Sequence, residues 1–211
     1  KDTAGNAMSS QYETSSGFTT TPRVFVAVGN SGKILTSNNG TSWTSRTSGT
    51  SSTLVGVTYG NSKFLILLPS WTSDNVSPTT GTVLTSSNGT TWTSDNATCS
   101  TCDNSSFTLT DVTYGNSTYV AVGNSGKILT SDNGTSWTSR TSGTSSNLFG
   151  VTYGNSKFLT MASWFTDNSS GGDNITTGTV LTSSNGTTWT SDNATCSTCD
   201  NSSFTLTDVT Y

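Results

Sequence analysis

The residues best suited to chemistry in this chain are four cysteines, which form two identical Cys-Ser-Thr-Cys segments at Cys99/Cys102 and Cys196/Cys199. This spacing serves redox-active dithiols, zinc ligands and local disulfides. A redox dithiol requires a thioredoxin-like unit with a helix after the first cysteine, and the surrounding sequence suggests neither. A four-cysteine zinc site would join segments that lie half of the repeat array apart. A disulfide within each segment is therefore the plain interpretation, and cross-linking between chains stays open.

Acid–base chemistry has few candidate residues. The chain contains no histidine, which is the commonest general base and metal ligand, and its only glutamate is Glu13. Asp95, Asp103, Asp192 and Asp200 could pair as in a glycosidase, but they lie in duplicated Ser/Asn-rich segments typical of turns. The sequence therefore predicts no catalytic residue, no cofactor and no metal site, and we expect no enzymatic activity.

Two tryptophans, Trp71 and Trp164, lie outside the regular strand pattern, in PSWTSDN (69–75) and ASWFTDN (162–168). A duplicated aromatic ring of this kind could form a sugar-binding platform. It could equally cap a sheet or seal a protein contact. We favour the second interpretation, because no cluster of charged or amide side chains beside either tryptophan marks a binding pocket.

Twelve Asn-x-Ser/Thr sequons could carry glycans on a secreted protein, although a chain this rich in Asn, Ser and Thr also makes sequons by chance. Those in expected hairpin turns (Asn39, Asn88, Asn133 and Asn185) are the best candidates because turns are exposed. Together with the paired cysteines and the 9% of charged residues, they favour an extracellular or cell-surface protein. The other sequons are at Asn75, Asn96, Asn104, Asn116, Asn168, Asn174, Asn193 and Asn201.

The composition excludes two classes of partner. The net charge is −4, and the five lysines and three arginines are scattered, so we expect no nucleic-acid partner. No segment approaches eighteen consecutive apolar residues, so no membrane span is expected. Leu, Ile, Val and Phe form less than a fifth of the chain, but they occur in short, regularly spaced runs. That regularity indicates a folded β protein with a hydroxyl-rich surface.

The chain is an internal duplication. The segment at 25–52 returns with few changes at 119–146, and the segment at 81–114 returns unchanged at 178–211. Repetition on this scale is typical of a modular architecture. It builds scaffolds and surfaces more readily than a single asymmetric reactive site.

Within each copy, short β-branched or aromatic segments recur in a fixed order. The order in the second unit is LVGVTYG (54–60), KFLILL (63–68), GTVLTS (81–86) and TWTSD (91–95). Gly-Asn-Ser links between first and second segments predict tight hairpin turns. Four strands per unit and four units predict an all-β propeller of four four-stranded antiparallel blades in an A-B-A-B pattern. The expected parts are a polar leader at 1–21 and blades at 22–53, 54–108, 109–147 and 148–205.

The turn between third and fourth strands is the sharpest local motif. TSDNGTSW (130–137) resembles the Asp-box, or bacterial neuraminidase repeat, although Asn38, Ser87 and Ser184 replace the acid in the other three copies. The whole unit resembles the blades of secreted and photosystem-assembly-type propellers. The resemblance implies a structural turn in which a polar side chain binds backbone amides, glycine adopts a positive φ and tryptophan packs between blades. Sialidase chemistry would further need an arginine cluster, a tyrosine nucleophile and a glutamate base, which this chain does not offer.

The remaining sequence feature concerns the two ends of the repeat. The first unit begins at its second strand, VFVAVG (24–29), and a surplus first strand, LTDVTY, stands at 206–211. The surplus strand could complete the first blade of its own chain and close a ring, or complete the first blade of a neighbour and build a filament. We therefore expect a self-associating structural protein of a surface or appendage. The alternative is a carbohydrate-binding module that uses Trp71 and Trp164.

Overall fold

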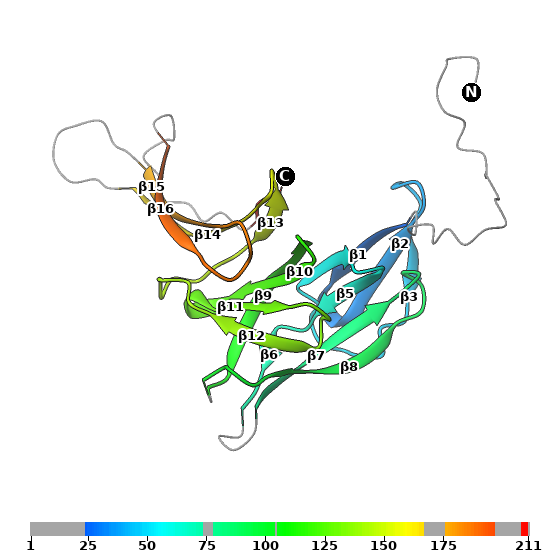
Figure 1. The fold of residues 1–211 in the computed structure, drawn as a ribbon. Coiled ribbons are helices and arrows are strands. Elements are labelled where there is room, and N and C mark those ends of the chain that lie inside the picture. The colour runs from blue at the N-terminus through cyan, green and yellow to red at the C-terminus, as the bar shows by residue number, and fades with distance from the viewer. Residues whose placement is uncertain (1–23, 74–77, 104, 167–175, 197–207, 211) are drawn as a thin grey trace, which may run out of the picture.

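The computed structural model describes residues 24–73, 78–103, 105–166, 176–196 and 208–210, and its regular elements are strands apart from two short 3-10 turns (Figure 1). The prediction of an all-β fold is confirmed. The expected leader at 1–21 lies outside the described residues, as do Cys199 and half of the segment 206–211. Among the described helices, none has the length and apolar character needed to cross a membrane.

The described strands form a three-stranded, a nine-stranded and a four-stranded sheet. The nine-stranded sheet contains two antiparallel groups joined by one parallel pair of strands, so we distinguish four antiparallel groups along the chain and refer to them as blades A to D. Blade A contains three strands, β1 (Phe25–Gly29), β2 (Lys33–Ser37) and β3 (Thr44–Arg46). Blade B contains β4 (Gly56–Gly60), β5 (Lys63–Leu67), β7 (Thr79–Ser86) and β8 (Thr93–Cys99). Blade C contains β9 (Phe107–Gly115), β10 (Thr118–Gly123), β11 (Ile128–Ser131) and β12 (Ser136–Arg140). Blade D contains β13 (Val151–Gly154), β14 (Lys157–Thr166), β15 (Thr176–Ser183) and β16 (Thr190–Cys196).

The hairpins form where the sequence predicts them. Asn61 and Ser62 both have positive φ angles, 48° and 60°, which is the backbone of a two-residue turn that matches the twist of the paired strands. The same pair recurs at 116–117 and 155–156. Two 3-10 turns complete the connections: η1 (Asn30–Gly32) joins β1 to β2 in blade A, and η2 (Asn124–Gly126) joins β10 to β11 in blade C.

Strand pairing extends into segments that we expected to be loops. The ladder between β7 and β8 continues to the pair Thr79↔Cys99, so both strands pass the expected bounds of 81–86 and 91–95. A short strand, β6 (Ser70–Trp71), pairs with β9 of blade C. The segment 206–211, which we expected to complete the first blade of this chain or of a neighbouring chain, is described only at 208–210, where no strand forms.

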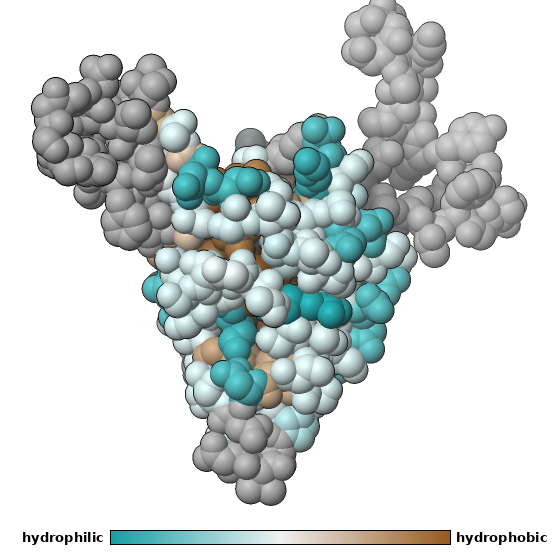
Figure 2. Space-filling view, turned by 60° about the vertical axis from the view of Figure 1, so that its left-hand side comes forward, coloured by the Kyte–Doolittle hydropathy of each residue, from teal (hydrophilic) through white to brown (hydrophobic). Residues whose placement is uncertain are grey.

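The core is divided among the junctions between blades. Separate apolar clusters lie between A and B, between B and C, and between C and D. Figure 1 shows the blades in sequence along an arc, with A and D at its two ends. The surface in Figure 2 is dominated by weakly polar and hydrophilic residues, and hydrophobic residues show in small areas only. Each blade is therefore stabilised chiefly by its neighbours, as expected for a stacked repeat.

Candidate functional site

In the turn between the third and fourth strands of a repeat unit, the side chains before and after the acid position of the motif make the stabilising hydrogen bonds. In blade C, the Gly134 amide donates to Ser131 Oγ at 2.8 Å. The Oδ1 atom of Asn133 accepts hydrogen bonds from the backbone amides of Thr135 and Ser136 at 2.9 and 2.8 Å. Trp137 Nε1 donates to the Gly134 carbonyl at 3.0 Å. The Asp132 side chain takes part in none of these bonds. The turn therefore forms equally well in the three copies that lack the acid.

The same bonds recur in all four blades, and each turn glycine has a positive φ between 73° and 81°. The predicted positive φ is confirmed, and the turn has a structural role. The turn residues are Ser37, Asn39, Gly40 and Trp43 in A; Ser86, Asn88, Gly89 and Trp92 in B; Ser131, Asn133, Gly134 and Trp137 in C; and Ser183, Asn185, Gly186 and Trp189 in D.

One side of each blade packs on the preceding blade, and in blade A this side is open. Trp137 and Tyr119 of blade C are only 2% and 0% exposed where they contact blade B. Their repeat equivalents in blade A, Trp43 and Phe25, are 42% and 59% exposed. Blade A thus presents an uncovered apolar side, which we call the A face and define by Phe25, Gly40 and Trp43.

The edge strand of this blade is also open. Among the described residues, β1 pairs with β2 alone, whereas its equivalent β10 pairs with both β9 and β11. Every residue of β1 is exposed or half-buried, but β10 is buried from Tyr119 to Gly123. A strand edge with free backbone donors and acceptors is a template for the addition of another strand.

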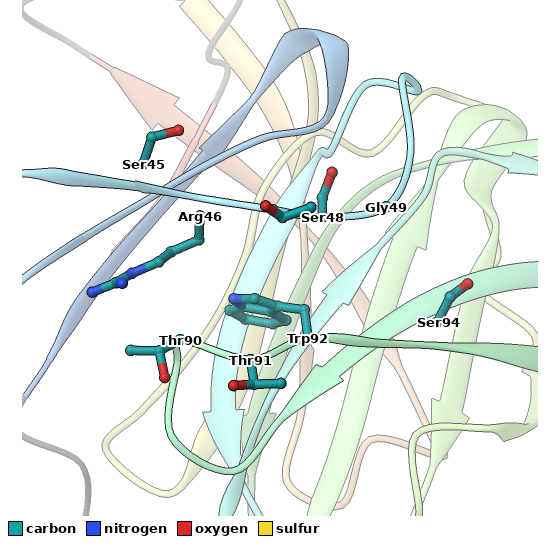
Figure 3. Close-up of a pocket in the computed structure, with 9 residues that line it drawn as sticks. Ser45, Arg46, Ser48, Gly49, Thr90, Thr91, Trp92 and Ser94 are labelled. Carbon is teal, nitrogen blue, oxygen red and sulfur yellow. The ribbon is translucent and has the colours of Figure 1, made fainter.

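A groove of about 480 Å³ lies between blades A and B (Figure 3). Its wall combines the half-buried ring of Trp92 with the Arg46 guanidinium and several hydroxyl groups, including that of Ser48. Arg46 is oriented by a 2.8 Å hydrogen bond from its Nε to Thr36 Oγ1. An aromatic face beside a cation and hydroxyls offers stacking and hydrogen bonding to a polar ring.

The two tryptophans selected from the sequence have different outcomes. Trp71 is fully buried, stacks on Phe107 at 5.7 Å and meets Trp137 edge-on at 6.2 Å. Its ring also occupies the space that a Cβ on Gly81 would need. The structure thus supports the packing interpretation of Trp71 and not a surface sugar platform. Trp164 belongs to β14, where it pairs with Gly178, and its side chain lies outside the described residues.

The first cysteine segment forms the predicted disulfide between Cys99 and Cys102. Cys196 is also disulfide-bonded, while its expected partner Cys199 lies outside the described residues. Within the described part of the chain, no three His, Cys, Asp or Glu side chains gather as a metal site.

The aspartates considered for catalysis have structural partners where they are described. Asp103 accepts a 2.7 Å bond from Lys127 and another from Ser105, and these bonds lower the pKa of its carboxyl group. Asp95 accepts a hydrogen bond from Thr85 Oγ1 at 2.8 Å. Asp192 is exposed on β16, and Asp200 lies outside the described residues. These contacts support the interpretation of Asp95 and Asp103 as structural residues.

Asp111 was not identified from the sequence. Its Oδ2 atom accepts the Val151 amide of blade D at 2.8 Å, and its Oδ1 would lie 2.8 Å from a Cβ on Gly56 of blade B. Burial raises the pKa of this carboxyl group to about 6, against the opposing effect of the amide bonds. The side chain thus connects three blades. In the sequence, the only sign of this role for Asp111 is that Asp and Gly alternate at its position from one first strand to the next.

The described sequons are accessible. Asn39, Asn88, Asn133 and Asn185 are exposed although their Oδ1 atoms hold the turns, and the other described candidates are exposed too. The latter are Asn96, Asn116 and Asn193. Asn75, Asn104, Asn168, Asn174 and Asn201 lie outside the described residues.

Comparisons with known proteins show the fold alone. No family model and no curated protein matches the chain. Among solved structures, it is similar to YCF48 bound to D1 peptide (TM-score 0.51, 14% identity over 88% of this chain and 53% of that one). It is also similar to YCF48 from Cyanidioschyzon merolae (TM-score 0.51, 17% identity, 81% and 52% coverage). The fold is therefore that of a β-propeller, and the chain spans about half the length of these structures.

Proposed function

We propose that this chain is a non-catalytic, extracellular structural protein whose copies join head to tail by strand donation. The observation that supports this most strongly is the edge of β1, which the described residues leave open in a blade with three described strands, whereas blades C and D each have four. In the proposed contact, the segment 206–211 of one copy pairs with β1 of the next. A surface or appendage component would be built in this way.

The internal repeat supplies the register of this contact. Residues 206–211 have the same sequence as 109–114, and in blade C that sequence forms β9 and pairs with β10. β1 has nearly the same sequence as β10. By equivalence, Phe25 pairs with Tyr211, Val26 with Thr210 and Ala27 with Val209. Backbone hydrogen bonds would supply affinity, and the alternating side chains would supply register.

Deletion of 206–211 tests strand donation. Removing the segment should abolish assembly in light scattering while leaving a folded monomer. A synthetic LTDVTY peptide should bind the truncated chain, whereas a matched peptide with proline in place of its second threonine should not, because proline removes a ladder donor. Unchanged assembly after the deletion would show that strand donation does not operate.

The extracellular part of the proposal draws on the exposed sequons and on the Cys99–Cys102 disulfide. In native material, the intact mass should exceed that of the bare polypeptide and should fall after enzymatic removal of N-linked glycans. A mass equal to the bare polypeptide would contradict glycosylation.

A second candidate function, carbohydrate binding, is favoured by the groove between blades A and B. Because Trp71 is buried, the aromatic residue that suits a sugar ring is Trp92. A glycan array should then show a ligand that is lost in Trp92→Ala and weakened in Arg46→Gln. The matched control is Arg140→Gln, because Arg140 makes the same hydrogen bond in blade C. An array without any ligand would dismiss this function.

A further inference from the structure

We infer that the A face binds blade D of a second copy and reproduces the contact that joins blade C to blade B. This inference rests on the proposed head-to-tail assembly and identifies its second component, a packed interface beside the donated strand. On blade D the matching surface, called the D face, is defined by Gly154, Lys157 and Leu159.

The B–C junction shows what the contact contains. Leu65 of blade B fills the space above Gly134 of blade C so closely that a Cβ on this glycine would overlap it. Tyr119 and Trp137 of blade C are buried beside this contact. The turn glycine is thus the point at which a side chain of the preceding blade enters the next one.

Polar bonds surround this apolar contact. Lys63 Nζ donates to the Asn133 carbonyl at 2.7 Å, and Asn61 Nδ2 lies 3.5 Å from the Asp132 carbonyl. The Tyr119 hydroxyl donates to the Gly60 carbonyl at 2.6 Å. All the acceptors are backbone carbonyls, so the contact depends on backbone position more than on side-chain identity.

The other junctions follow the same rule. Val24 and Val26 of blade A lie 3.0 and 3.4 Å from the Cβ position of Gly89 in blade B. Val120 of blade C lies 3.1 Å from that of Gly186 in blade D, and Asn116 Nδ2 donates to the Ser184 carbonyl at 3.4 Å. In blades A, B and C, the second strand of the repeat therefore presents an aliphatic residue (Val26, Leu65 or Val120) to the turn glycine of the next blade.

At the two ends of the arc, the described residues contain only one half of this junction. The Cβ position of Gly40 has no neighbour closer than Phe25, at 4.0 Å. On blade D, Lys157 is exposed and Leu159 is half-buried, although Leu65 at the equivalent position is completely buried. Among the described residues, no preceding blade covers the A face, and blade D is followed only by the short segment 208–210, of which Asp208 and Val209 lie against Gly150.

The repeat makes these two halves complementary. Blade D has the B-type sequence and blade A has the C-type sequence, so D followed by A of a second copy recreates the B–C order. Leu159 then meets Gly40 of the second copy, and Lys157 reaches the carbonyl of its Asn39. Phe25 lacks the hydroxyl by which Tyr119 binds blade B, so the contact between copies is weaker than the internal one.

This contact joins different surfaces of the two copies, so it propagates. It closes into a ring if the rotation permits and otherwise continues as a filament. A filament leaves one free A face and one free D face at its two ends, whereas a closed ring leaves neither.

A complementation experiment tests the two faces. Trp43→Asp blocks the A face, and Leu159→Asp blocks the D face. In sedimentation velocity, we expect wild type to form larger species as its concentration rises and each variant alone to stay monomeric. An equal mixture should form one-to-one dimers and nothing larger, because one intact pair of faces remains.

Urea denaturation of each variant serves as the control for folding. Lys157→Glu supplies a second D-face variant at an exposed position. Single variants that assemble like wild type would overturn the inference. So would a mixture that stays monomeric. A wild type that is monomeric at every concentration, with its faces covered within one chain or left unused, would also overturn it.

The deletion of 206–211 separates this inference from strand donation. If the deletion abolishes assembly while the face variants assemble normally, strand donation stands and the face contact falls. If face variants lose assembly while the deletion keeps it, the face contact stands and strand donation falls.

Discussion

The packing of blade C on blade B can be measured by adding one methyl group to a turn glycine. Gly134→Ala places a Cβ where Leu65 already lies, at a residue with φ of +81°. Gly40→Ala makes the same change at φ of +78° in blade A, where the nearest atom to the Cβ belongs to Phe25 and is 4.0 Å away. Both variants carry the cost of a positive φ, but only Gly134→Ala also disturbs a contact between blades.

The expected magnitudes follow from these two terms. An alanine in the left-handed region costs about 1 to 2 kcal/mol of stability at either site. Overpacking against the buried Leu65 side chain adds about 1 to 3 kcal/mol at Gly134 alone. Gly134→Ala should therefore lower the free energy of unfolding by about 2 to 5 kcal/mol in total, against about 1 to 2 kcal/mol for Gly40→Ala.

Urea denaturation provides the assay, at a protein concentration where wild type is monomeric. The two variants should share one m-value with wild type and differ in midpoint, because the extent of the surface exposed on unfolding does not change. Equal midpoints for the two variants would refute the reasoning, since they would show that Leu65 does not restrict the turn glycine.

Three further predictions concern single groups. Asp111→Asn should make stability less dependent on pH. Because the pKa of Asp111 is raised in the folded state, its stabilising contribution is complete below about pH 4 and is lost as the pH rises past about 6, so urea melts at pH 7 should show the variant more stable by up to about 2 to 3 kcal/mol. A difference in wild-type stability between pH 4 and pH 7 that is also present in the variant would contradict this prediction. Tyr119→Phe removes the bond to the Gly60 carbonyl and should cost about 1 to 2 kcal/mol, measured by thermal unfolding, whereas an unchanged melting temperature would exclude a stabilising bond. Peptide mapping of native material should find glycans at exposed turn asparagines such as Asn39 and Asn88, and unmodified peptides at both would count against glycosylation of the turns.

Local features of the fold could be predicted from the sequence. The Asn61-Ser62 hairpin depends on two neighbouring residues that accept positive φ, and the positive φ of Gly134 depends on its own turn. The disulfide of Cys99 with Cys102 is equally local. In each case the residues that determine the structure are close together in the chain.

Features that depend on more than one blade could not be predicted in this way. The sequence predicted that a polar side chain of the turn motif binds backbone amides, but it did not show that Ser131 and Asn133, whose side chains point across the turn, are the residues that do so. Trp71 is buried because β6 pairs with β9 of the next blade. Asp111 gains its role from groups in two other blades. No periodicity within one segment shows such neighbours.

The most direct test of head-to-tail assembly is electron microscopy of the 211-residue chain over a range of concentrations. The account predicts closed rings or filaments whose repeating unit is the set of four blades, and their disappearance in Trp43→Asp. Single arcs or discs at every concentration, identical in wild type and variant, would contradict it.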